Sequence, residues 1–131
     1  MRAQPDWLSE HDEQAALFQW AMTIANARWP ELELLFAIPN AGRMGGHKGR
    51  MWGGRLKKEG LRAGVPDLFL PVPRGSYHGL FLELKRVKHG STSTIQTAWH
   101  TALRAQGYQV EVAKGAQAAI AILTVYLQLG S

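Results

Sequence analysis

Hydrophobic positions near the amino terminus recur at helical spacing. Ser9 precedes them as a plausible N-cap, and acidic residues fill the first turn, where they favour the helix dipole. The pattern predicts a helix over about residues 9–28, which Pro30 ends. The apolar positions that carry it are Ala16, Leu17, Trp20, Ala21 and Ile24.

Short apolar runs follow and predict strands. Residues 34–38 predict a short buried strand that Pro39 stops. Residues 67–70 and 80–84 predict two neighbouring strands, with a turn at 73–76 between them.

The last third of the chain predicts two helices and another strand. One helix spans about residues 94–106 and is closed by Gly107, a strand follows at 110–112, and an apolar helix covers 116–128. A further helix is expected around residues 50–59. The order α-β-β-β-α-β-α predicts an α/β fold with a mixed central sheet flanked by helices.

Length and composition restrict the class of protein. A chain of 131 residues has the size of one domain, so we expect a single domain over residues 1–131. The absence of cysteine excludes disulfides, thiolate zinc sites and a cysteine nucleophile. The amino terminus lacks a signal-peptide pattern, and the longest apolar stretch, residues 118–129, is too short to cross a bilayer. We therefore expect a soluble protein of the cytoplasm with no membrane partner.

The net charge of +5 is unevenly distributed. Residues 1–33 carry six acidic side chains, whereas residues 43–62 carry seven basic side chains, many glycines and a single acid. A glycine-rich basic loop suits a nucleic-acid backbone, although a solvated surface loop has the same composition. Asn40 is the other candidate contact in this region, and its alternative role is to cap the turn at Pro39. The candidate DNA-binding residues are Asn40, Arg43, Lys48, Arg50, Arg55, Lys57, Lys58 and Arg62.

Three charged residues lie on the predicted central strands, where isolated charge is costly. Glu83 and Lys85 alternate with leucines and therefore point to one face, and Asp67 can approach Glu83 if the two strands pair as a hairpin. Two close carboxylates repel each other, and a divalent cation resolves that repulsion. Oxygen ligands without cysteine favour Mg²⁺ or Mn²⁺. The alternative is an exposed ion pair between Glu83 and Lys85, with Asp67 capping a turn.

The histidines show no metal-binding spacing. We expect surface positions for all five, although His47 in the basic loop could contact phosphate. The five are His11, His47, His78, His89 and His100.

Several segments together resemble a known nuclease family. They are SEHDEQAALFQWA at 9–21, FAIPNAGR at 36–43, GVPDLFLPV at 64–72, HGLFLELKR at 78–86, Ile95-Gln96 with Trp99, and Gln106-Gly107-Tyr108. Their order and spacing resemble the PD-(D/E)XK nuclease superfamily, and more closely its virus-type replication–repair nuclease (VRR-NUC) family, in particular the short stand-alone phage members.

The resemblance implies roles for individual residues. Asp67, Glu83 and the Leu84 carbonyl would bind the metal, and Lys85 would be the catalytic lysine. Gln96 would face the site from the following helix, although an ordinary surface position is the alternative.

The family also places an acidic residue in the first helix, four residues before a glutamine. Glu10 satisfies this spacing with Gln14, but Glu13 is the alternative. A simpler interpretation of Glu13, as a first-turn residue that complements the helix dipole, is slightly preferred.

The resemblance further implies a Mg²⁺- or Mn²⁺-dependent DNA endonuclease that resembles Holliday-junction resolvases. It would cut branched DNA as a homodimer in a bacterial or phage-infected cell. Two alternatives are a non-catalytic DNA-binding subunit and a less selective DNA or RNA nuclease of the same superfamily.

Overall fold

The computed structural model describes residues 9–39, 58–88 and 90–130. Its regular elements include both helices and strands, which gives a mixed α/β architecture, as the hydrophobic pattern predicts. They are helix α1 (Glu10–Met22), the 3₁₀ turns η1 (Ala25–Ala27) and η2 (Pro30–Leu34), strands β1 (Phe36–Ala37), β2 (Leu68–Leu70) and β3 (Leu80–Lys85), helix α3 (Thr94–Ala105), strand β4 (Gln109–Lys114) and helix α4 (Ala116–Leu127).

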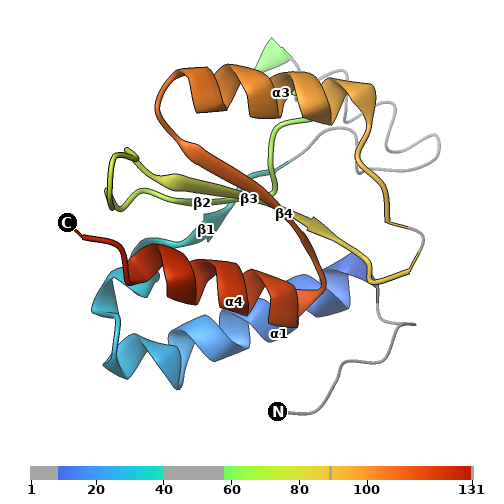
Figure 1. Cartoon of the computed structure of the whole chain (residues 1–131). Helices are drawn as coiled ribbons and strands as arrows, with labels where there is room; N and C mark the ends of the chain where they lie inside the picture. The colour runs from blue at the N-terminus through green and yellow to red at the C-terminus, as the bar shows by residue number, and fades with distance from the viewer. Residues whose placement is uncertain (1–8, 40–57, 89, 131) are drawn as a thin grey trace.

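The four strands form one mixed sheet in the order β1-β2-β3-β4. Strands β1, β2 and β3 pair antiparallel, whereas β4 lies parallel to β3. A parallel pair needs a crossover connection, and α3 provides it. Helices α1 and α4 lie on one face of the sheet and α3 lies on the other (Figure 1). The predicted mixed sheet with flanking helices is therefore confirmed.

The hydrophobic core fills the space between the sheet and the pair α1 and α4. Leu82 and Leu84 of β3 are buried there together with Leu17 of α1 and Leu123 of α4. Successive side chains of a strand point to opposite faces, so Glu83 and Lys85 point to the face that α3 covers. The core thus fixes which face of β3 carries charge.

The first helix ends earlier than its apolar pattern predicts. It stops at Met22 instead of residue 28, and the hydroxyl of Thr23 donates to the Gln19 carbonyl at this end. A β-branched residue whose hydroxyl bonds a preceding carbonyl competes with helix continuation. Pro30 begins the 3₁₀ turn η2 instead of ending α1, since proline is well tolerated in a first helical turn.

The predicted buried strand at 34–38 is wrong in length and in exposure. Strand β1 holds two residues, and Phe36 within it is 48% exposed. Only Leu35 of the apolar run is buried in the core. The reason is position: among the described residues, β1 lies at the edge of the sheet and pairs with β2 alone.

The remaining predicted elements match within a few residues at their ends. Strand β4 is longer than the predicted 110–112, and the turn at 73–76 is closed by a bridge between Arg74 and Tyr77. The helix expected around 50–59 lies almost entirely outside the described residues. Within the described part of the chain, no helix has the length and apolar character needed to span a membrane.

Candidate active site

The register between β2 and β3 brings two carboxylates to the same place in the sheet. Leu68 pairs with Leu82, so Asp67, one residue before β2, lies opposite Glu83. Both side chains are removed from solvent, with 2% of Asp67 and none of Glu83 exposed. The alternative of an exposed ion pair between Glu83 and Lys85 is wrong in its exposure, because both side chains are buried.

Asp67 is held by the backbone of the neighbouring strand. Its Oδ2 accepts a hydrogen bond of 2.7 Å from the Leu84 amide. The register of β2 and β3 ends at Leu68 and Leu82, and the carboxylate supplies an acceptor for a buried backbone donor just beyond it. The Lys85 carbonyl accepts from Gly115 on the β4 side, and because successive carbonyls alternate, the Leu84 carbonyl is directed toward the Asp67 side.

Lys85 is the positively charged side chain of the site and is 8% exposed. Its Nζ donates to Gln96 Oε1 at 2.8 Å and lies 3.9 Å from Glu83 Oε2. The Gln96 oxygen also accepts from the Ser93 amide, which is the capping box at the start of α3. Gln96 therefore faces the site, and one hydrogen-bond network ties the lysine to the first turn of the helix.

His100 also belongs to this cluster, and our expectation of a surface position for it is wrong. It is 4% exposed, and its Nε2 lies 3.5 Å from Glu83 Oε1. Burial lowers the pKa of His100, and the positive charges of Arg104 and Lys85 lower it further. The imidazole is therefore neutral at neutral pH.

A sequence signal for His100 existed. Residues four apart lie on the same face of a helix, and His100 follows Gln96 by this spacing. Of the other histidines, His11 and His78 are exposed, as expected, whereas His47 and His89 lie outside the described residues.

The two acidic candidates of α1 differ in environment. Glu10 is half-buried, whereas Glu13 is fully buried and its Oε2 accepts a 2.8 Å hydrogen bond from the Ala116 amide. Burial raises the pKa of Glu13. Glu13 lies in the first turn of α1, as expected, but it is buried and its carboxylate also caps the start of α4.

The arrangement suits a hard divalent cation. Asp67 and Glu83 supply two carboxylates, and the Leu84 carbonyl adds a third oxygen at the same end of the paired strands β2 and β3. Among the described residues, no group of three or more histidine and acidic side chains is placed to hold a metal. Mg²⁺ needs no such group, because it is commonly bound through one or two carboxylates and keeps several waters. The donor set therefore fits Mg²⁺ or Mn²⁺ better than zinc.

The predicted DNA-contacting residues fall mostly outside the described part of the chain. Lys58 and Arg62 are described, and both are exposed. Asn40, Arg43, Lys48, Arg50, Arg55 and Lys57 lie outside the described residues.

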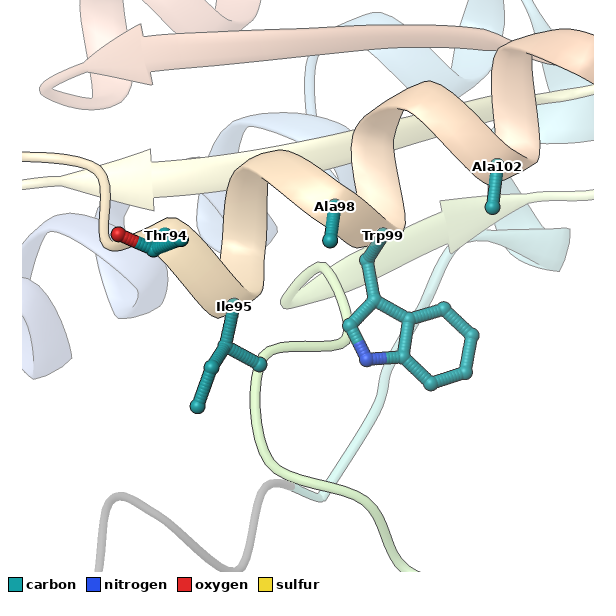
Figure 2. A pocket seen from close by; sticks show the side chains of 5 residues that line it. All are labelled: Thr94, Ile95, Ala98, Trp99 and Ala102. Carbon is teal, nitrogen blue, oxygen red and sulfur yellow. The ribbon is translucent and has the colours of Figure 1, made fainter.

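Helix α3 also carries an apolar groove of about 440 Å³ (Figure 2). Its lining residues are Thr94, Ile95, Ala98, Trp99 and Ala102. Trp99 donates its indole N–H to the Ala63 carbonyl at 3.1 Å, which joins the helix to the end of the basic segment. Ile95 and Trp99 therefore lie beside the segment before β2, whereas Gln96 and His100 face the charged pair on β3.

Comparisons with known proteins agree with this geometry. The model of the VRR-NUC domain family matches residues 4–117. A solved structure described as a VRR_NUC domain protein is similar over all of this chain and 94% of its own, with 25% sequence identity and a TM-score of 0.78. No curated protein matches the chain.

The family match covers most of the chain, including every residue of the Asp67, Glu83 and Lys85 cluster. A VRR-NUC domain is a nuclease of the virus-type replication–repair class, which implies a hydrolase that acts on DNA, and such nuclease domains generally use divalent metal ions. The chain therefore belongs to the VRR-NUC domain family.

Proposed function

We propose that this protein is a Mg²⁺- or Mn²⁺-dependent, structure-selective DNA endonuclease that acts as a homodimer on branched DNA. The observation that carries the proposal is the convergence of Asp67, Glu83 and Lys85. The two carboxylates lie opposite each other in the sheet, and the lysine amine lies 3.9 Å from Glu83. This convergence supports the PD-(D/E)XK site that the sequence resemblance implies.

The metal would be held by the Asp67 and Glu83 carboxylates together with the Leu84 carbonyl. When bound, such a cation polarises a phosphoryl oxygen and lowers the pKa of a water. Asp67 is suited to this role because one of its oxygens is fixed by the Leu84 amide at 2.7 Å. A fixed carboxylate loses less conformational freedom when a ligand binds.

Lys85 would act on the attacking water and on the charge of the pentacoordinate phosphorus. Its 2.8 Å hydrogen bond to Gln96 holds the amine in place, as electrostatic stabilisation of a transition state requires. In the proposed reaction, the water oxygen bonds to phosphorus while the bond from phosphorus to the 3′ oxygen breaks. The leaving oxygen takes up a proton, so the products are a 5′-phosphate and a 3′-hydroxyl.

Selectivity for branched DNA follows from size and charge. The sequence shows no helix-turn-helix or zinc finger for reading bases, so we expect the protein to recognise DNA shape and backbone. The seven basic residues within 43–62 would supply backbone contacts. Two copies would place two sites on the symmetric strands of a junction, which one small domain cannot cover alone.

The test is a cleavage assay with Lys85→Ala and with Lys88→Ala, a matched control at an exposed position on the same segment. The substrates are a four-way junction, a flap, duplex DNA, single-stranded DNA and RNA, with Mg²⁺ or Mn²⁺. We expect the parent and Lys88→Ala to cut the junction preferentially and Lys85→Ala to bind without cutting. An intact junction with stoichiometric parent identifies a non-catalytic subunit, and equal cutting of all substrates identifies a less selective nuclease.

The homodimer has a separate test. Co-purified dimers of one parental and one Asp67→Asn protomer contain one intact site. We expect them to nick a junction in one strand, whereas parental dimers resolve it with paired cuts. Light scattering gives the mass, and a monomer mass for the active species contradicts the dimer.

A further inference from the structure

Two side chains of helix α3 contact the charged pair Glu83 and Lys85 on β3. Gln96 and His100 are one helical turn apart and lie on the same face. Gln96 accepts from Lys85, as described above. His100 lies against the other member of the pair, because its Nε2 is 3.5 Å from Glu83 Oε1.

The Glu83 carboxylate is thereby approached from two sides. Lys85 Nζ lies 3.9 Å from its Oε2 while His100 lies at its Oε1. A separation of 3.5 Å exceeds a full N–H···O hydrogen bond, but such contacts in unliganded active sites commonly tighten when the complex forms. We propose that His100 is a positioning residue whose Nε2–H holds the Glu83 carboxylate in the orientation that binds the divalent cation. This inference rests on the metal site of the proposed function.

A role in packing alone does not explain a histidine at this position. His100 is the one buried residue among the twelve of α3, and an aliphatic side chain would fill the same space without burying polar nitrogens. The Nε2 of the buried ring lies 3.5 Å from Glu83 Oε1, so an N–H at this nitrogen has the carboxylate as its acceptor. The geometry therefore suits a donor to Glu83.

Three substitutions at His100 separate these roles. His100→Gln keeps an amide N–H near the position of Nε2, His100→Asn is polar but too short to reach, and His100→Leu removes the donor. Thr101→Ala is the control, because Thr101 is the next residue of α3, is exposed and bonds only within the helix in the contacts observed. Thermal unfolding without metal establishes which variants are folded.

Calorimetric titration with Mn²⁺ in the absence of DNA measures binding directly. Loss of a group that orients a metal ligand typically weakens affinity by about 10- to 100-fold. We expect a loss in this range for His100→Leu and His100→Asn, near-parental affinity for His100→Gln, and parental affinity for Thr101→Ala. In cleavage assays, His100→Asn should be impaired at limiting Mn²⁺ and recover at saturating Mn²⁺, a recovery that a packing defect does not produce.

Parental Mn²⁺ affinity in folded His100→Asn overturns the positioning role and leaves the proposed nuclease intact. Equal losses in His100→Gln and His100→Asn overturn it as well, because the shared cause would then be packing. If the parent binds no Mn²⁺ and cuts no substrate, the proposed function and this inference fail together. The three outcomes are therefore distinguishable.

Discussion

Asp67 serves two roles that substitution can separate. Its Oδ2 accepts from the buried Leu84 amide at 2.7 Å, and its negative charge lies opposite Glu83. Asp67→Asn keeps an oxygen that can accept from Leu84 but removes the charge, whereas Asp67→Ala removes both. We expect both variants to lose DNA cleavage and only Asp67→Ala to lose stability.

The magnitudes follow from the buried amide and from the metal. A buried N–H left without a partner costs about 1–3 kcal/mol, so Asp67→Ala should unfold at a midpoint lower by about 4 °C for each kcal/mol. Asp67→Asn relieves repulsion between two carboxylates and should match or exceed the parent without metal. Mn²⁺ at about 100 times its dissociation constant should stabilise the parent by about 2.7 kcal/mol, and should stabilise neither variant.

Thermal unfolding of the parent and both variants, each with and without Mn²⁺, provides the assay. Circular dichroism monitors the fold, and cleavage of a four-way junction is measured on the same preparations. Equal midpoints for Asp67→Ala and Asp67→Asn without metal would refute the stabilising role of the hydrogen bond to Leu84. A parental Mn²⁺-induced rise in either variant would refute the metal role of Asp67.

Three further predictions address the fold around the site. Gly64→Ala should lower the free energy of unfolding, measured with denaturant, by more than about 2 kcal/mol. Gly64 has a φ of +88°, and a Cβ there would lie 2.3 Å from Ile95 Cγ2. A smaller loss of stability would contradict this packing. Tyr126 donates a hydrogen bond to the Val72 carbonyl, and burial raises the pKa of its hydroxyl above 10.0. The protonated hydroxyl therefore contributes its full share to folding stability below pH 10.0, and this share is lost as the pH rises through the raised pKa. Tyr126→Phe should therefore cost about 1 kcal/mol near neutral pH, and unfolding at increasing pH should show the difference shrinking in alkaline solution. Burial also raises the pKa of Glu13 above 4.5, so its ionised form costs stability as the pH rises. Glu13→Gln should gain stability over the parent at neutral pH and lose this gain in acid, and a difference that is constant with pH rules this out.

The charged residues of the strands were predictable because strand geometry is local. A period of two places Glu83 and Lys85 on one face, and a hairpin pairing then brings Asp67 opposite Glu83. These steps need only neighbouring residues and one turn, and the register of β2 and β3 agrees with them. Metal binding and catalysis by these residues remain predictions.

Boundaries and exposure at the sheet edge were less predictable because they depend on position in the fold. The run at 34–38 has the composition of a buried strand, but nothing local indicates that β1 lies at an edge and pairs on one side only. At the end of α1, by contrast, the contact is local: the Thr23 hydroxyl donates to the Gln19 carbonyl, which weakens the last helical turn.

His100 was not predicted because it lies on the polar side of α3. The apolar stripe of this helix contains Ile95, Ala98 and Trp99, and an amphipathic pattern predicts that such a stripe faces the core. Ile95 and Trp99 lie instead beside the segment before β2, whereas Gln96 and His100 face Glu83 and Lys85, whose buried charges favour polar partners. Once a strand is known to turn charge toward a helix, the polar face of that helix is the one to search for residues of the site. That rule selects His100, one turn after Gln96.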